Sequence, residues 1–199
     1  MQNPIKSNKL LPEEDGVANR KETAMLGGGC FWCLETAFRL LKGVKNVVSG
    51  YAGGTEARPT YEEVSSGTTG HAEVVKIEYD PKIISFKQIL KVFFTLHDPT
   101  TLNRQGNDIG EQYRSAIFYK TGRQKKEAEK IIEKLTREKK FEKPIVTAIL
   151  PLTKFYPAEN CHQEYYEKNP KKAYCRLIIN PKLEKLTEKF AALLKNQRV

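Results

Sequence analysis

The spacing of apolar side chains divides this chain into segments of two different periods. Residues 72–79 alternate from one face to the other, as a half-buried strand does. Apolar residues recur at steps of three and four in residues 31–41 and 86–94, which is the period of an amphipathic helix. Ser85 stands where a helix-capping residue would be expected. The pattern therefore predicts helices packed on a sheet.

The same pattern predicts the order of the elements. Strands are expected at residues 23–26, 44–51, 72–79, 113–119, 145–150 and 174–179. Helices are expected from Phe31 onward and at residues 60–65, 86–96, 125–140, 158–168 and 181–194. Without the ends, the order is strand, helix, strand, strand, helix, strand. We therefore predict the α+β class, as a two-layer α/β sandwich with a ferredoxin-like (split β-α-β) core and irregular extensions.

The N-terminal residues differ in composition from the rest of the chain. Residues 1–22 are mostly polar and hold no apolar centre of a signal peptide, so we expect a flexible N-terminal arm. Residues 23–199 are expected to form a single domain, long enough to bury a core. No apolar run has the length of a membrane span, and four cysteines are too few for a disulfide scaffold. We expect a cytoplasmic monomer with reduced thiols and no membrane partner.

The net charge of +10 is concentrated in one part of the chain. Residues 120–199 contain 20 Lys and Arg against 10 Asp and Glu, whereas residues 1–119 contain 14 of each kind. A basic region can bind nucleic acid, but Lys/Glu-rich helices with a solvated face account for this excess better. No nucleic-acid-binding motif accompanies the charge, so we expect no nucleic acid partner.

Cys30 is the first candidate for chemistry. Gly27, Gly28 and Gly29 precede it as a turn free of side chains, and the helical period begins at Phe31. Free N–H groups and the positive end of the helix dipole at this position favour a thiolate over a thiol. A buried core cysteine is the alternative. The position at a glycine turn favours a nucleophile.

Several polar residues are weaker candidates. Glu73 begins a mostly apolar strand, where burial would raise its pKa and allow it to act as an acid near neutral pH. Tyr61 precedes this strand, Asp108 lies in a long polar loop, and Tyr113 follows that loop. None of the four would be selected on composition alone.

Six blocks of sequence, taken in order, resemble the A-type peptide methionine sulfoxide reductases. The resemblance runs from about Ala24 to Tyr166, so we expect a catalytic core at 24–166 and a basic C-terminal extension at 167–199. The matching blocks are Gly29-Cys30-Phe31-Trp32, Gly50-Tyr51, Tyr61 with Ser66-Gly67, Thr69-Gly70-His71-Ala72-Glu73, His97-Asp98-Pro99-Thr100 with Asn103 to Asp108 and Gln112 to Ser115, and His162-Gln163.

The resemblance implies an enzyme that reduces methionine S-sulfoxide, free or in proteins, and so repairs oxidised proteins. It implies that Cys30 is the nucleophile and becomes a sulfenic acid, and that Glu73 is the proton donor. Tyr61 and Tyr113 would donate hydrogen bonds to the same oxygen. The substrate-binding residues would be Phe31 and Trp32, as walls of an apolar pocket, and Asp108, which would orient substrate or water.

A second cysteine would then form an intramolecular disulfide that thioredoxin reduces, without a bound cofactor or metal. Many relatives carry this cysteine in a glycine-rich tail, but here no cysteine follows Cys175. Cys33, one helical turn after Cys30, is our first choice as the resolving residue. Cys161, beside His162, is the alternative. Cys175 is expected to be a core thiol.

Other functional classes remain open at this stage. A thioredoxin-like dithiol oxidoreductase also has Cys-x-x-Cys at a helix start, although its Trp usually precedes the first cysteine rather than lying between the two, as Trp32 does here. A zinc-binding module would use Cys30, Cys33, Cys161 or His162, and Cys175. The second half of the chain has no second Cys-x-x-Cys pair, which argues against zinc.

Overall fold

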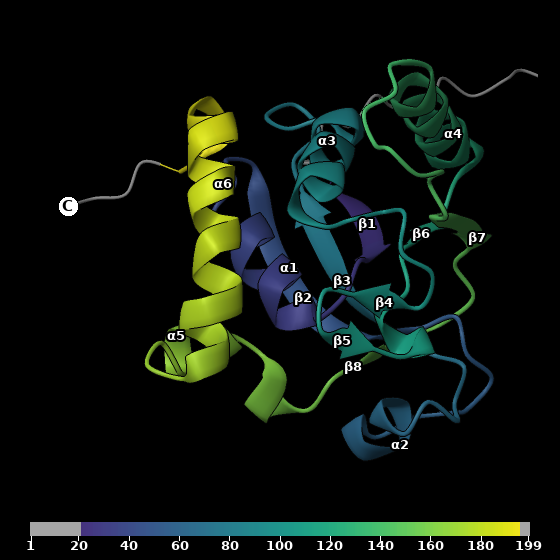
Figure 1. The fold of residues 1–199 in the computed structure, drawn as a ribbon, viewed down its shortest axis with the longest axis vertical. Coiled ribbons are helices and arrows are strands. Elements are labelled where there is room, and N and C mark those ends of the chain that lie inside the picture. The colour runs from purple at the N-terminus through teal and green to yellow at the C-terminus, as the bar shows by residue number, and fades with distance from the viewer. Residues whose placement is uncertain (1–20, 196–199) are drawn as a thin grey trace, which may run out of the picture.

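The computed structural model describes residues 21–195 (Figure 1). The predicted N-terminal arm, residues 1–22, lies outside the described residues except for its last two. The fold is α+β, as predicted, and is built on a six-stranded mixed sheet of order β7-β6-β1-β3-β2-β8. The strands are β1 (Glu22–Gly27), β2 (Val44–Ala52), β3 (Ala72–Tyr79), β6 (Ala116–Tyr119), β7 (Ala148–Pro151) and β8 (Phe155–Pro157). A separate small hairpin joins β4 (Arg104–Gln105) to β5 (Asp108–Ile109).

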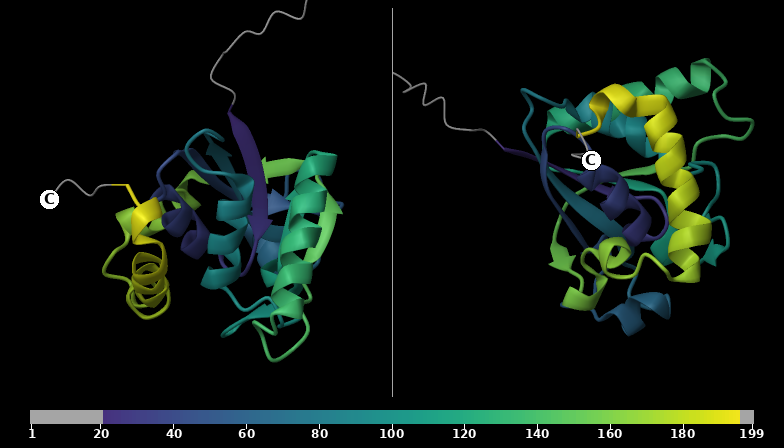
Figure 2. Two further views of the ribbon diagram at one scale, coloured as in Figure 1. Left: turned by 90° about the horizontal axis from the view of Figure 1, so that it is seen from above. Right: turned by 90° about the vertical axis from the view of Figure 1, so that its left-hand side faces the viewer.

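Neighbouring strands of the large sheet run antiparallel, except for the parallel pair β6 and β7. The helices are α1 (Phe31–Arg39), α2 (Tyr61–Ser65), α3 (Phe86–Leu96), α4 (Gly122–Arg137), α5 (Tyr165–Lys168) and α6 (Asn180–Phe190). The main core lies between the sheet and the helices α1, α3 and α4, and α6 packs outside α1 and α3 (Figure 2). A smaller apolar cluster, which includes Met25, Val74 and Phe118, covers the other face.

Most predicted elements are confirmed, some with shifted ends. The strand at residues 72–79 is found as predicted. Ser85 caps α3 by accepting a hydrogen bond from the Gln88 N–H, and the Gln88 side chain accepts one from the Ser85 N–H in return. The strand predicted at 113–119 begins only at Ala116, because a 3-10 turn at Glu111–Tyr113 precedes it.

The strand predicted at residues 174–179 is wrong. Cys175–Ile179 is helical and continues directly into α6. Cys175 and Ile179, four positions apart, are both buried, whereas Leu177 between them is 71% exposed. A strand would place all three on one face, so the burial follows the helical period. Among the described residues, no helix is both long and apolar enough to cross a membrane.

Candidate active site

The glycine turn after β1 places Cys30 at the N-cap of α1, as predicted. Side chains other than hydrogen would not fit in this turn. A Cβ on Gly28 would lie 2.8 Å from the Phe93 ring, and one on Gly29, whose φ is +87°, would lie 2.6 Å from Gln105. The turn therefore holds Cys30 just beyond the C-terminal end of the central strand β1, where the residue is 6% exposed.

The Glu73 carboxyl group lies directly against this helix start. The Phe31 N–H donates a hydrogen bond of 2.9 Å to Glu73 Oε2. Glu73 is 1% exposed, and burial raises its pKa to about 8, even though the Phe31 hydrogen bond acts in the opposite direction. As the sequence indicated, this carboxyl group is mainly protonated at neutral pH and can donate a proton.

Burial opposes the predicted preference of Cys30 for the thiolate. It raises the pKa of Cys30 well above its ordinary value, and Cys33 and the Glu73 carboxyl group raise it further. It is Cys33 whose pKa is lowered, to about 7, chiefly by its hydrogen bond with Cys30.

Two tyrosines face the same group of residues. Tyr61 begins α2, and Tyr113 ends the 3-10 turn before β6. Burial is the main cause that raises the pKa of both phenols, and the charge of the Glu73 carboxyl group is the second largest cause for both. Cys30 and Asp108 also raise both pKa values. The structure therefore gathers four predicted residues from separate segments around the Cys30 thiol: Tyr61, Glu73, Asp108 and Tyr113.

Phe31 and Trp32 form an aromatic wall beside this group. The Phe31 ring is fully buried. Its centroid lies 6.1 Å from that of the Trp32 ring and 6.4 Å from that of the Tyr61 ring. Trp32 stacks on Tyr165 at 3.7 Å with an interplanar angle of 8°. His162 completes the wall by stacking on Tyr61 at 4.2 Å. These rings supply an apolar surface next to the thiol, as the sequence suggested for the first two.

Tyr174 is a site residue that the sequence did not reveal. Its hydroxyl donates a hydrogen bond of 2.9 Å to Asp108 Oδ2 and lies 4.0 Å from Cys33 Sγ. From the same C-terminal region, the Lys182 ammonium group lowers the pKa of Cys33. The incorrect strand assignment at 174–179 concealed this contact. Extending the helical period of α6 toward the residues before it would have predicted a helix at 174–179 and could have revealed Tyr174.

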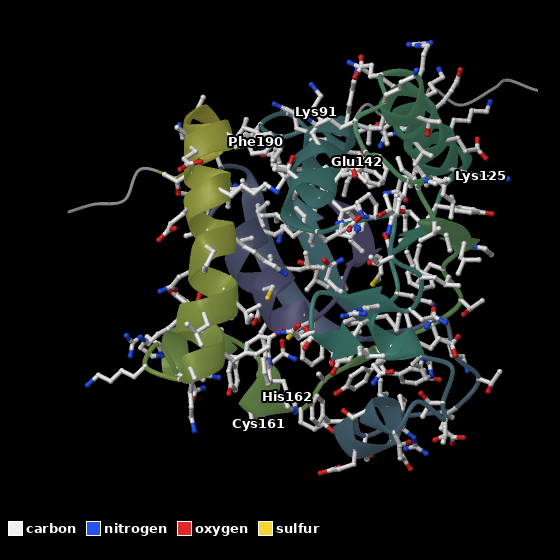
Figure 3. The ribbon with its side chains drawn as sticks, in the orientation of Figure 1. Lys91, Lys125, Glu142, Cys161, His162 and Phe190 are labelled. Carbon is white, nitrogen blue, oxygen red and sulfur yellow. The ribbon has the colours of Figure 1, made fainter. Side chains whose placement is uncertain are left out.

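The other two cysteines lie in different surroundings. Cys161 is exposed in the 3-10 turn Asn160–His162, next to His162 at the edge of the aromatic wall (Figure 3). Cys175 is fully buried, as expected of a core thiol. In the part of the chain that the structure describes, no three His, Cys, Asp or Glu side chains are grouped as metal ligands. The zinc-binding alternative therefore gains no support from the structure.

Comparison with known proteins gives one consistent family. Residues 22–194 match the family described as "Peptide methionine sulfoxide reductase". The chain is 54% identical over 175 residues to "Peptide methionine sulfoxide reductase MsrA" of Chromobacterium violaceum, covering 88% of this chain and 99% of that protein. The corresponding protein of Acinetobacter baumannii (strain AYE) is also 54% identical, with the same coverage.

Solved structures agree with these matches. Reduced Mxr1 from Saccharomyces cerevisiae superposes with a TM-score of 0.73 at 37% identity, over 78% of this chain and 89% of that one. Methionine sulfoxide reductase A of Corynebacterium diphtheriae gives a TM-score of 0.71 at 38% identity, over 79% and 78%. Mxr1 in complex with Trx2 gives 0.53 at 28% identity, over 76% and 91%.

Proposed function

Since this chain belongs to the peptide methionine sulfoxide reductase family, we propose that it reduces methionine S-sulfoxides through a sulfenic acid on Cys30. It is an enzyme of the MsrA type. The observation that carries the mechanism is the buried Glu73 carboxyl group, hydrogen-bonded to the N–H of the residue after Cys30 and mainly protonated at neutral pH. A sulfoxide needs both a nucleophile at sulfur and a proton at oxygen, and this site supplies the two side by side.

In the first step, Cys30 attacks the sulfoxide sulfur while Glu73 donates its proton to the oxygen. The Cys30 pKa is raised, so its thiol must lose a proton during the attack, and the Glu73 carboxylate just formed accepts it. The oxygen leaves the substrate sulfur and ends on Cys30 as a sulfenic acid. The substrate sulfur is reduced by two electrons, and Cys30 is oxidised by two.

Tyr61 and Tyr113 hold the oxygen during this step. Their raised pKa values keep both phenols protonated, so that each can donate a hydrogen bond. Phe31 and Trp32 hold the substrate methyl group against the aromatic wall, and Asp108 orients the substrate or a water molecule.

In the second step, the Cys33 thiolate attacks the Cys30 sulfenic acid and forms the disulfide. The hydroxide released from Cys30 takes up the proton that Cys33 gave to the solvent and leaves as water. A pKa of about 7 leaves a large fraction of Cys33 as thiolate at neutral pH, and its place one helical turn after Cys30 supports this role. Cys161 remains the alternative resolving residue.

Thioredoxin is the proposed reductant of this disulfide. Support comes from the solved complex of Mxr1, a protein of similar fold, with Trx2. No bound cofactor is required, since the electrons come from thiols throughout. The alternative function is a thioredoxin-like dithiol oxidoreductase, which would use Cys30 and Cys33 without Glu73.

We also infer a ferredoxin-like core for this domain. The order β6-β1-β3-β2, antiparallel throughout, with α1 between β1 and β2 and α3 after β3, supports it. The cytoplasmic location, the monomeric state and the absence of a nucleic acid partner stay predictions.

The test uses reduced protein with separate S and R epimers of methionine sulfoxide and no recycling reductant. We expect two thiols lost per methionine formed, on the S epimer only. Cys33→Ser is expected to complete one turnover but not to cycle with thioredoxin, whereas Cys175→Ser cycles normally. Undiminished cycling by Cys33→Ser would remove Cys33 from the role, and loss of cycling in Cys161→Ser would assign it to Cys161. Methionine from neither epimer would refute the reductase mechanism.

A further inference from the structure

A basic groove opens beside the active-site turn. It has a volume of about 700 Å³ and lies between the C-terminal end of α3, the first turns of α6 and the segment that follows α4. Figure 1 shows α6 running alongside α3. Glu142, in the segment that follows α4, is labelled in Figure 3. Its lysines, which we call the groove lysines, are Lys140, Lys143, Lys182 and Lys185.

The groove lysines carry positive charge that the protein itself does not neutralise. Within residues 21–195, none of their ammonium groups takes part in an ion pair or donates a hydrogen bond to a protein oxygen. The groove also contains Asp98 and Glu142, but the Asp98 carboxylate already accepts hydrogen bonds from the N–H and the hydroxyl of Thr100. A bound anion would therefore meet ammonium groups that no protein oxygen holds at hydrogen-bond distance, although Lys182 also acts on Cys33 and Lys143 on Asp98.

Like charges are crowded together in this groove. Burial lowers the pKa of Lys185, and the neighbouring ammonium groups of Lys189, Lys140 and Lys182 lower it further. Two or more carboxylates placed among these ammonium groups would relieve the repulsion. The chemical class that fits the groove is thus an anion with several charges, such as an acidic peptide segment.

Two residues connect the groove to the catalytic turn. Gln105 lines the groove, and its side chain packs closely on Gly29, next to Cys30. A Cβ atom added to Gly29 would lie 2.6 Å from the Gln105 side chain. The Gln105 amide is fixed by hydrogen bonds to the N–H and carbonyl groups of Asp98. Lys182 lines the groove as well, and its ammonium group lowers the pKa of Cys33. One end of the groove therefore lies beside the active-site turn, with Gln105 against Gly29 and Lys182 near Cys33.

We propose that this groove binds acidic side chains that flank the methionine sulfoxide in an oxidised protein, so that the enzyme prefers sulfoxides in acidic sequence. The inference rests on the proposed function, because it requires that Cys30 acts on a sulfoxide within a peptide. A carboxylate one to three residues from the sulfoxide lies within about 11 Å along an extended chain. Acidic residues at these positions are the ones to vary.

The test compares three capped heptapeptides with a central methionine S-sulfoxide, flanked on both sides by Glu, Gln or Lys. Capping removes terminal charges, and a small dithiol serves as reductant so that no protein partner contacts the groove. We expect kcat/KM to fall in the order Glu, Gln, Lys, with roughly three- to tenfold between the first and the last, as for a few exposed ion pairs. The difference should shrink at about 0.5 M salt, roughly threefold above physiological ionic strength, because salt screens exposed charges.

Charge-reversal variants locate the effect. Lys143→Glu with Lys185→Glu should abolish or invert the preference while leaving kcat/KM for the Gln peptide within about twofold, which also shows that the variant is folded. The matched control is Lys125→Glu with Lys126→Glu on α4; Lys125 lies at the side of the molecule away from α6 (Figure 3). This control makes the same change in net charge and should keep the preference.

Two results would overturn the inference. Equal kcat/KM for the three peptides at low salt would do so, as would an unchanged preference in the groove variant. Both leave the proposed function intact, because the Gln peptide is still reduced. Failure to reduce any of the three peptides would instead be a failure of the proposed function.

Discussion

At the scale of single residues, burial controls the proton chemistry of the site. It keeps the Glu73 carboxyl group protonated up to a pKa of about 8, which suits an acid at neutral pH. The same burial raises the pKa of Cys30, against the prediction from its helix-start position. In the proposed mechanism, attack and protonation are therefore coupled, because the Cys30 thiol gives its proton to the Glu73 carboxylate that has just released one.

This coupling predicts a pH profile that depends on Glu73. Reduction of the sulfoxide should decrease as the pH rises through about 8, where the folded protein loses the Glu73 proton. Glu73→Gln keeps the shape but has no acidic proton, so methionine formation in a single turnover should slow by about 10²- to 10⁴-fold and lose this limb of the profile. Rapid-quench rates from pH 6 to 10 measure both effects. A Gln variant with the native profile would show that another group supplies the proton.

There is a physical reason why the sequence reveals some site residues and not others. Cys30 stands at the start of a helix with a clear period, so its position could be predicted, whereas Glu73 was a weak candidate until the family resemblance selected it. The protonation state of Cys30 could not be predicted, because it depends on desolvation by the assembled fold. Tyr174 is separated from Asp108 by 66 residues and carries no local pattern that connects the two.

At the scale of elements, local pattern succeeded where the period is regular over eight or more residues. The capped helix α3 has one core-facing side, and β3 keeps its alternation over residues 72–79 although both of its faces are covered. Residues 174–179 form too short a run to distinguish strand from helix, and packing against α1 and α6 decides the outcome. The hairpin of β4 and β5 falls in a polar loop with no period, so no local pattern indicated it.

The helical course of residues 174–179 has a functional consequence, because it brings the Tyr174 hydroxyl between Cys33 and Asp108. Tyr174→Phe removes a hydrogen bond that lowers the Cys33 pKa, so that pKa should rise from about 7. We expect disulfide formation, measured as the disappearance of the second thiol, to slow roughly three- to tenfold at pH 7. This corresponds to an activation free energy higher by about 0.7–1.4 kcal/mol. Methionine should form at the native rate.

Trapping the sulfenic acid over time with a dimedone-type reagent would measure this delay. The matched control is Tyr166→Phe, which removes a hydroxyl bound to Asn180 in the same C-terminal region without touching either thiol. If the two variants behave alike, Tyr174 contributes only to the packing of the extension. A delay that disappears at pH 9, where Cys33 is ionised in both proteins, would confirm the electrostatic origin.

At the scale of the whole molecule, burial keeps His97 and Glu73 mainly in their neutral forms. His97, with a pKa lowered to about 4 by burial, bonds to the Phe93 carbonyl and the Ser115 hydroxyl. The Glu73 carboxyl group accepts one hydrogen bond within residues 21–195 and has a pKa raised to about 8. A group that is difficult to ionise in the folded state but ionises freely in the unfolded state makes stability depend on pH.

The sign of this dependence can be worked out for Glu73. Between its unfolded pKa of about 4.3 and its folded pKa of about 8, the folded protein holds a proton that the unfolded chain has lost. The free energy of unfolding therefore falls as pH rises through this window, by up to about 1.4 kcal/mol per pH unit from this group alone. Glu73→Gln lacks the ionisation and should lack this part of the slope.

We therefore compare the free energies of unfolding of Glu73→Gln and the native protein. Their difference should change in favour of the variant by roughly 2–4 kcal/mol as the pH rises from about 5 to about 8, although the variant loses activity. Urea denaturation at several pH values measures the difference. Glu133→Gln, at an exposed position of α4, is the matched control and should change the slope little. A constant difference between native protein and Glu73→Gln across this window would mean that Glu73 ionises as easily in the folded as in the unfolded state. It would then not be protonated at neutral pH, and the acid of the reaction would have to be another group.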